Sequence, residues 1–154
     1  MISNYFITQE LDGLRTLSKY TGSDADVVIP DGIEAIGSQA FANNSSIKSI
    51  VIPQSVRSIA DSAFAGCTSL TGVNIPSGLT SIGNGLFEGC SSLVSIVIPY
   101  SVTSIGYRAF WDCDAFTDVY FGGTEDEWNA LIENIGNFNL PLLNATIHYN
   151  YIEE

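Results

Sequence analysis

The stretch "SIVIPQSVRSIADSAF", residues 49–64, decides the fold because the chain repeats it. The pattern returns as "GVNIPSGLTSIGNGLF" at residues 72–87 and as "SIVIPYSVTSIGYRAF" at residues 95–110, each time 23 residues further on. A fixed period of this length indicates a solenoid, in which each repeat forms one coil and the coils stack.

Six columns of residues keep this period along the chain, and five of them do so over four copies. They are Ile29, Ile52, Ile75 and Ile98; Pro30, Pro53, Pro76 and Pro99; Ile33, Val56, Leu79 and Val102; Ile36, Ile59, Ile82 and Ile105; Phe41, Phe64, Phe87 and Phe110; and Ile47, Leu70 and Leu93, with Phe116 in fourth place. One repeat alone cannot bury its apolar face, so stacking is expected to turn the Ile and Phe columns into continuous buried rows.

Each repeat is predicted to hold one short strand, a proline stop and a turn. The segment L-x-x-I-x-I places alternate apolar residues on one face, which is strand spacing. Proline has no N–H for a ladder, so it ends the strand at the same place in every coil. The apolar residues that follow are three apart, which favours a bend and a single helical or 3₁₀ turn. Coils about 4.8 Å apart would pair these strands in a parallel sheet.

The unit "SLTGVNIPSGLTSIGNGLFEGC", residues 69–90, resembles the 23-residue leucine-rich repeat of the BspA-like bacterial family. The flanks "LSKYTGSDADVVIP" and "YFGGTEDEWNAL" resemble the segments that bracket such repeats. The resemblance implies an α/β solenoid, a right-handed superhelix with short parallel strands on its concave face. It also implies a bacterial cell-surface or secreted setting, with roles in adhesion and in binding host proteins.

We expect residues 1–154 to form a single domain with capped ends: residues 1–23 as the N-terminal cap, 24–121 as four repeats and 122–154 as the C-terminal cap. Two alternating runs around Asp12-Gly13 predict a β-hairpin at the start. At the other end, Thr124 and Glu127 form a T-x-x-E capping box before the amphipathic stretch "EDEWNALIENI". This predicts a helix that stops at Gly136, followed by a short strand in "NATIHY".

The charge of the chain argues against two classes of partner. Seventeen acidic and five basic residues give a formal net charge of -12. A nucleic-acid-binding protein needs a basic stripe, and none exists here; attraction to an anionic membrane surface is disfavoured for the same reason.

The sequence also bears on the compartment. No apolar run approaches the roughly 20 residues that span a bilayer, so no membrane insertion is expected. The start "MISNYFITQELDG" lacks the features of a signal peptide, which leaves a cytoplasmic location as the alternative to the cell surface. The oligomeric state is not readable from the sequence.

No catalytic motif is found, so we expect a non-enzymatic protein with no cofactor and no metal. Hydrolase, zinc-protease and phosphate-binding patterns are absent from the sequence. The single histidine, His148, is interpreted as a surface residue, because a catalytic role would need a nucleophile or a carboxylate within hydrogen-bond reach and no catalytic motif in the sequence supplies one. Asp24, Asp26 and Asp31 could surround a cation at the start of the first coil, although a solvated edge is the plainer interpretation.

Cys67, Cys90 and Cys113 fall in one column, with Asn44 in the same column of the first coil. Three interpretations remain open: small buried residues that meet loop backbone groups, a disulfide, or a metal site. Side chains stacked in parallel have poor disulfide geometry, and zinc usually needs four converging ligands.

Outward positions on and just after the strands are expected to form the concave face, which is the candidate binding surface because concave faces of solenoids commonly bind partners. They are Val28, Val51, Asn74, Val97 and Tyr120 on the strands, and Gln54 and Tyr100 after prolines. Tyrosines and exposed aliphatic residues suit a protein partner, although valine and tyrosine are favoured in any strand. The family resemblance implies that this partner is a host extracellular protein. The sequence therefore predicts a protein-binding, adhesion-type module, with a cytoplasmic scaffold of unknown role as the alternative.

Coil four carries a second unusual group, Tyr107, Arg108 and Trp111, on its other side. These residues are interpreted either as packing against the C-terminal helix and Trp128 or as a binding patch.

Overall fold

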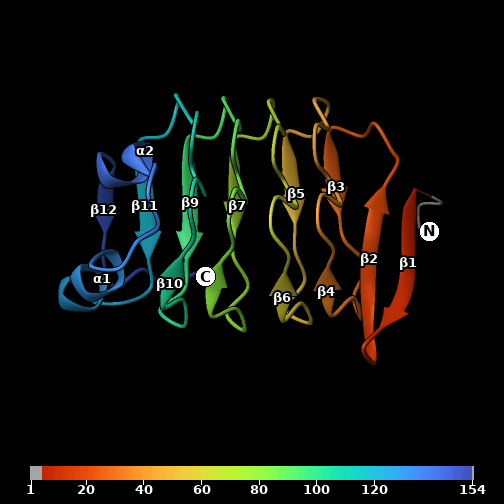
Figure 1. The fold of residues 1–154 in the computed structure, drawn as a ribbon, viewed down its shortest axis with the longest axis horizontal. Helices are drawn as coiled ribbons and strands as arrows, with labels where there is room; N and C mark the ends of the chain where they lie inside the picture. Colours follow the sequence, from red (N-terminus) through yellow and green to blue (C-terminus); the bar gives the residue numbers. More distant parts are fainter. Residues whose placement is uncertain (1–4, 154) are drawn as a thin grey trace.

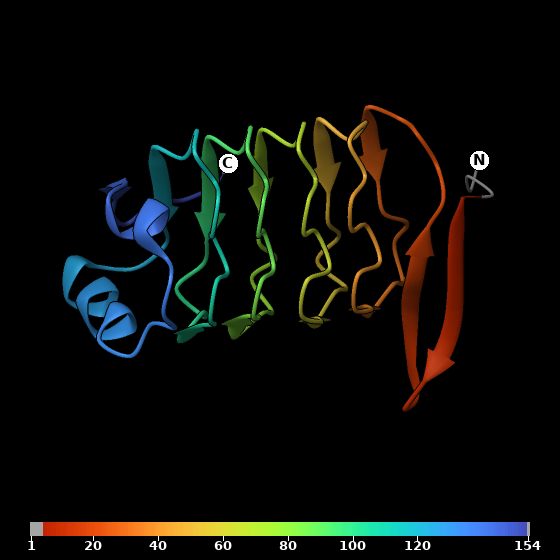
Figure 2. The ribbon, with the colours of Figure 1, turned by 45° about the horizontal axis from the view of Figure 1, so that its top comes forward.

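The computed structural model describes residues 5–153, which form a β-solenoid of about five turns. The coils follow one another along the long axis (Figure 1). A hairpin of β1 (Phe6–Leu11) and β2 (Leu14–Tyr20) lies at one end, and α1 (Glu125–Ile132), α2 (Leu140–Leu143) and β12 (Thr146–His148) lie at the other. A turned view shows the same row of coils with strands along two of its sides (Figure 2).

One side of the solenoid carries the longer strands, which are parallel. These strands are β3 (Asp26–Val28), β5 (Ser49–Val51), β7 (Gly72–Asn74), β9 (Ser95–Ile98), β11 (Asp118–Phe121) and β12 (Thr146–His148). Equivalent residues lie side by side, so Val28 pairs with Val51, and Asn74, Val97, Tyr120 and His148 follow one another across four strands. The ladder is interrupted once, between β5 and β7.

The opposite side carries a second set of strands that the sequence analysis did not predict. They are the two-residue strands β4 (Ala35–Ile36), β6 (Ser58–Ile59), β8 (Ser81–Ile82) and β10 (Ser104–Ile105). The turn expected here follows the strand: the Ala63 N–H donates to the Ala60 carbonyl at 3.3 Å, and the Cys67 N–H donates to the Phe64 carbonyl at 3.2 Å. Because helices are confined to two short segments near the end of the chain, the α/β class is not confirmed, and the fold is a β-solenoid.

The prolines end the longer strands as expected. β9 stops at Ile98, one residue before Pro99, and the Pro99 carbonyl accepts from the Val102 N–H at 3.2 Å, which closes a turn. In the last coil Gly122 stands in the proline column. Its N–H donates to the Ile98 carbonyl at 2.9 Å, a bond that proline could not make.

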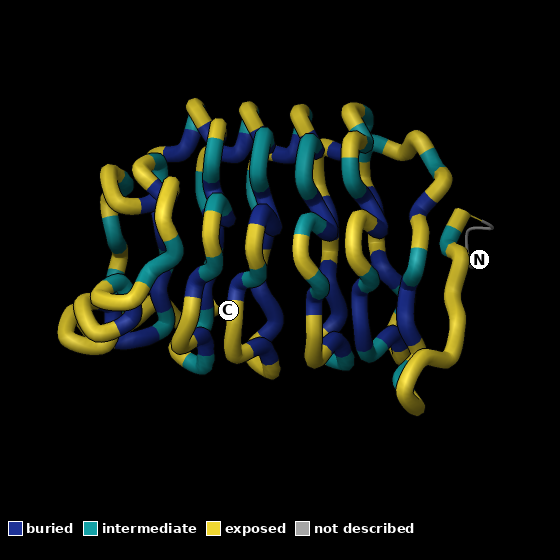
Figure 3. The backbone as a smooth tube through the Cα atoms, viewed as in Figure 1, coloured by how far each residue is buried: buried dark blue, intermediate teal, exposed yellow. Residues whose placement is uncertain are grey.

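The core is a row of aromatic rings inside the coils. Phe41, Phe64, Phe87 and Phe110 are fully buried, and successive ring centroids lie 5.2, 5.8 and 5.6 Å apart. Tyr20 extends this row at one end, 5.3 Å from Phe41. The tube coloured by burial shows the inner walls buried and the loop tips exposed along the whole solenoid (Figure 3). The predicted single file of phenylalanines is confirmed.

An antiparallel hairpin precedes the first coil. β1 (Phe6–Leu11) pairs with β2 (Leu14–Tyr20), and the turn residues Asp12 and Gly13 both have positive φ, 52° and 77°. β2 then pairs in parallel with β4, so the hairpin continues the sheet of two-residue strands. Residues 1–4 of the expected cap lie outside the described residues. That the hairpin acts as a cap stays a prediction.

After β11 the chain forms α1 (Glu125–Ile132), α2 (Leu140–Leu143) and β12. Both bonds of the capping box between Thr124 and Glu127 are present. The helix ends four residues before Gly136, so the predicted helix stop is wrong. Gly136 instead packs against coil four, where a Cβ would lie 2.3 Å from backbone atoms of Gly106 and Tyr107. Nothing in the sequence pattern predicted α2.

Candidate functional site

We name the outward surface of β3, β5, β7, β9, β11 and β12, together with the residues that follow the prolines, the long-strand face. Its apolar side chains are exposed: Val28 is 65% exposed, Val51 56% and Tyr100 71%. Asn74 and Gln54 are also exposed, whereas Val97 and Tyr120 are half-buried. All seven predicted residues therefore belong to one face. Their role in binding stays a prediction.

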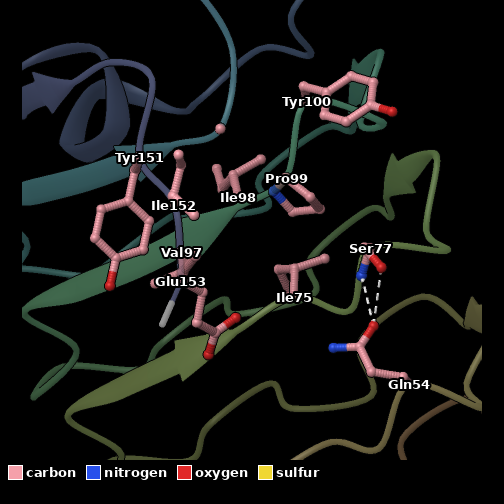
Figure 4. Close-up of a pocket in the computed structure, with 11 residues that line it drawn as sticks. Gln54, Ile75, Ser77, Val97, Ile98, Pro99, Tyr100, Tyr151, Ile152 and Glu153 are labelled. Atoms are coloured by element: carbon pink, nitrogen blue, oxygen red, sulfur yellow. Dashed lines mark hydrogen bonds between the residues drawn. The ribbon is translucent and has the colours of Figure 1, made fainter.

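The face is hollowed at its centre. A groove of about 400 Å³ lies between Val97 and Ile98 on one side and Gln54, Ser77 and Tyr100 on the other (Figure 4). Its remaining wall is a segment from the end of the chain, residues Tyr151, Ile152 and Glu153. The side-chain Oε1 of Gln54 accepts from both the N–H and the hydroxyl of Ser77, at 3.1 and 2.9 Å, which fixes the polar rim. The groove is thus floored by apolar side chains and edged by polar ones.

A second hollow, of about 370 Å³, opens where the ladder is interrupted. It lies between residues 49–54 of β5 and its proline turn and residues 72–74 of β7, with Glu153 also in contact. Ile29 and Ile75 each donate an N–H to the next coil, at 3.0 and 2.9 Å, but the Ile52 N–H at the equivalent position has no such bond among the described residues. The loop side of the same two coils stays joined by the Phe64 N–H, which donates to the Leu86 carbonyl at 3.2 Å.

His148 lies at the end of the long-strand face and is exposed, which confirms the interpretation that it is a surface residue. Its ring stacks on Tyr120 at 4.6 Å, and its Nε2 lies 2.7 Å from the Asp118 carboxylate. Hydrogen bonds from His148 and then from Thr117 lower the pKa of Asp118. Tyr151 closes the group with its ring 5.1 Å from that of Tyr120. These contacts join β12 and the chain end to the face, and they place a carboxylate within hydrogen-bond reach of His148, which the sequence did not predict.

The cysteine column confirms the interpretation that these residues meet loop backbone. The Sγ atoms of Cys67, Cys90 and Cys113 donate to the carbonyls of Phe41, Phe64 and Phe87, at 3.2, 3.2 and 3.1 Å. In the first coil the Asn44 Nδ2 donates to the Gly22 carbonyl at 3.1 Å. All three thiols are buried and unpaired, so the disulfide interpretation is wrong.

The aspartates of the first coil bond to separate partners. Asp24 accepts from the Tyr20 hydroxyl at 2.9 Å, and Asp26 accepts from the Ser49 hydroxyl. Within residues 5–153, the structure brings together no group of three histidine, cysteine or acidic side chains that could hold a metal ion. The structure therefore does not gather Asp24, Asp26 and Asp31 into a cation site.

The aromatic group of coil four packs on a different partner from the one expected. The rings of Tyr107 and Trp111 contact Phe138 edge-on, at 5.4 and 5.2 Å. Arg108 lies over Trp111 and pairs with Glu88 at 2.7 Å. Trp128, which the sequence analysis placed beside them, instead packs on Phe121 at 5.3 Å.

Three residues that sequence reasoning missed bear on the face or on its support. Tyr151 and Glu153 line the groove, yet no repeat pattern covers them. Asn139 is buried and closes the last coil, because its side chain accepts from the Phe110 N–H at 3.0 Å and donates to the Gly106 carbonyl at 2.9 Å. A lone asparagine outside the repeats gave no signal of this role.

The described part of the chain contains no helix long and apolar enough to cross a membrane. The model of the BspA-type leucine-rich repeat region matches residues 19–131, in six copies. The chain belongs to this family. The match extends the repeat signal into β2 and α1, beyond the four units read from the sequence. The division into four repeats and two caps stays a prediction.

Solved structures of bacterial leucine-rich repeat proteins share the fold of this BspA-type protein. A leucine-rich cell surface protein of Faecalibacterium prausnitzii is 30% identical over 80% of this chain, with a TM-score of 0.61. A leucine-rich repeat protein of Bacteroides ovatus is 25% identical over 97% of it, with a TM-score of 0.70. The T. pallidum leucine-rich repeat protein is 24% identical over 98% of this chain, with a TM-score of 0.68, and the match covers 82% of the T. pallidum protein.

The chain spans 42% of the length of the F. prausnitzii protein and 37% of that of the B. ovatus protein. No curated protein matches this sequence.

Proposed function

We propose that this chain is a non-enzymatic module that binds a protein partner through the long-strand face, in an adhesion-type role at a bacterial surface. The observation that carries the proposal is that the long-strand face combines exposed apolar side chains, Val28, Val51 and Tyr100, with an open groove. A folded chain gains nothing in stability by leaving Val28, Val51 and Tyr100 exposed. Exposed apolar positions gathered beside a groove are the usual mark of an interaction site.

The family supports the same proposal. Leucine-rich repeat proteins are generally non-enzymatic and mediate protein–protein contacts, and one structural relative is described as a cell surface protein. The three thiols do not favour the cytoplasmic alternative, because buried thiols are protected from oxidation in either compartment.

Charge narrows the kind of partner. The rim of the face carries Asp26, Asp31 and Asp118, and the whole chain has a net charge of -12. A partner with an apolar centre and a basic rim would be complementary, and its association would slow as salt is added.

The test compares two substitutions that add the same charge on opposite sides of the solenoid. Val51→Asp places a carboxylate on the long-strand face, and Ser81→Asp places one on β8, at an exposed position of the other side. Binding is measured to an array of host extracellular-matrix proteins and to proteins from a bacterial lysate. We expect Val51→Asp to weaken binding roughly tenfold or more and Ser81→Asp to leave it unchanged. Equal binding by both variants would refute the proposal.

A further inference from the structure

The end of the chain lies across the long-strand face. We name residues 149–153 the strap. After β12 the chain reverses at Asn150, which has a positive φ of 54°. The Asn150 N–H donates to the Gly123 carbonyl at 2.8 Å, and the Tyr151 N–H donates to the Phe121 carbonyl at 3.0 Å. From there the strap runs past Ile98 and Val97, with its side chains beside the groove (Figure 4).

Two side chains of the strap contact residues of the coils. The Tyr151 ring packs on Tyr120, and the Glu153 carboxylate accepts from the side-chain amide of Asn74, a residue 79 positions earlier. Between them Ile152 is 83% exposed. The strap therefore forms a wall of the groove without filling it.

The strap explains an irregularity in the repeat. Within the repeats, the outward column on the strands is apolar or aromatic at four of its five positions, Val28, Val51, Val97 and Tyr120, and polar only at Asn74; His148 of β12 continues the column beyond the repeats. β-branched and aromatic residues are favoured at such positions, and asparagine is not. The one polar side chain of the column within the repeats is the one that donates to the strap carboxylate.

Few contacts hold the strap in place. For residues 150–153 they are two backbone hydrogen bonds, one ring contact and one side-chain hydrogen bond, most of them at exposed residues, while Tyr149 is half-buried against the core. Segments with few buried apolar contacts and exposed hydrogen bonds open locally at low free-energy cost. An extended segment of another protein that makes the same contacts and also fills the groove would displace the strap.

We propose that the strap is an internal occupant of the long-strand face, and that the partner binds through an extended segment with an aromatic, then an aliphatic, then an acidic side chain. The aromatic ring packs on Tyr120 in place of Tyr151, the aliphatic side chain enters the groove over Val97 and Ile98, and the carboxylate accepts from Asn74. This inference rests on the proposed function, because it names the chemistry that the same face recognises. The partner carries this one acidic side chain in the segment that binds Asn74, and its surface around that segment is basic.

The test uses a fluorescein-labelled peptide with the strap sequence, Tyr-Asn-Tyr-Ile-Glu, and the full chain. The double variant Tyr151→Ala with Glu153→Gln removes the two side-chain contacts of the strap. Both residues are exposed, so folding is expected to be unaffected. Tyr107→Ala with Glu133→Gln makes the same chemical changes at exposed residues away from the face.

Fluorescence anisotropy is expected to show the strap variant binding the peptide roughly tenfold or more tightly than the natural chain. The matched control variant should behave like the natural chain. Adding Asn74→Ala to the strap variant, or replacing the last two residues of the peptide by Ala, should abolish the gain. The NMR chemical shift of the Asn74 side-chain amide is measured as well, because it should change when the strap leaves the face.

Three results would overturn the inference: an Asn74 resonance that does not move in the strap variant, equal peptide binding by the natural chain and the strap variant, or a gain that survives Asn74→Ala. The proposed function is judged separately. If Val51→Asp weakens partner binding while strap release changes neither peptide nor partner binding, the strap inference fails and the function stands. If Val51→Asp has no effect on partner binding, the function itself fails.

Discussion

At the scale of single residues, the phenylalanine row packs across successive joints between coils. Phe87 is the clearest case: it is fully buried and lies between Phe64 and Phe110, with ring centroids 5.8 and 5.6 Å away. Each ring thus contributes to two joints, and removing one leaves a cavity between coils that the stacked backbone cannot easily close.

Phe87→Ala is therefore expected to lower the free energy of unfolding by about 3–5 kcal/mol, from lost burial and the cavity together. Chemical denaturation followed by circular dichroism measures the change. Tyr100→Ala provides the control, because that ring is 71% exposed; we expect a change within about 0.5 kcal/mol. A loss for Phe87→Ala as small as that of the control would mean that the row does not hold the coils together.

The cysteines make a second prediction at this scale. Burial raises the pKa of Cys67 and of Cys113 from 9.0 to about 12, and burial also raises the pKa of Cys90. The folded protein at pH 8 should therefore not react with a thiol reagent, while the unfolded chain reacts at all three positions. Ready labelling of the folded chain at pH 8 would contradict the buried column.

Because these pKa values are raised on folding, their contribution to stability is fully present below the unfolded value near 9. It falls as the pH rises from there towards 12. Denaturation at pH 8 and pH 10.5 tests the sign, since stability should be lower at the higher pH.

The backbone conformation at some positions could not be predicted, because the residue type there does not indicate it. Gln39, Ser62, Gly85 and Arg108 form one column, and all four have φ between 55° and 60°. Left-handed backbone is costly for residues other than glycine, so only Gly85 signals it in the sequence. Because the four positions are equivalent in the repeat, the glycine at one of them indicates left-handed backbone at all four.

At the scale of elements, the joint between the second and third coils differs from the others. The strand ladder is interrupted on both sides of the solenoid, between β5 and β7 and between β6 and β8, while the loop side stays bonded. β7 contains Gly72 and Asn74, two residue types that weaken strands. The joint is therefore the place where the face can open most easily.

Hydrogen exchange measured residue by residue should show this. We expect the amide of Ile52 to exchange roughly tenfold or more faster than those of Ile29 and Ile75, which occupy the same position in neighbouring coils and donate to the next strand. Equal protection at the three amides would show that the ladder is continuous in solution.

The sequence predicted the longer strands inside the repeats better than the elements outside them. Strand spacing and the proline column located every longer strand within the repeats, and the T-x-x-E box located the start of α1. The two-residue strands were missed, because a run of two residues has no periodicity to read. α2 and the strap lie outside the repeats and are fixed by tertiary contacts: Asn139 with Phe110 and Gly106, and Glu153 with Asn74.

At the scale of the whole molecule, stacking produces a surface as regular as the core. Register places equivalent outward side chains side by side, so the same repetition that buries the phenylalanines also exposes Val28, Val51 and Tyr100 together. The sequence predicted which residues share this face. It could not predict the groove, because one of its walls comes from the strap rather than from a repeat.

The most direct measurement is site-specific photo-crosslinking of the natural partner. A photoreactive phenylalanine analogue is placed at Val51 on the long-strand face in one version and at Ser81 on the opposite side in another, both of them exposed strand positions. Crosslinking to the partner at position 51 and none at position 81 is the predicted result. Crosslinking at position 81 with none at position 51 would place the binding surface on the other side of the solenoid and contradict the account.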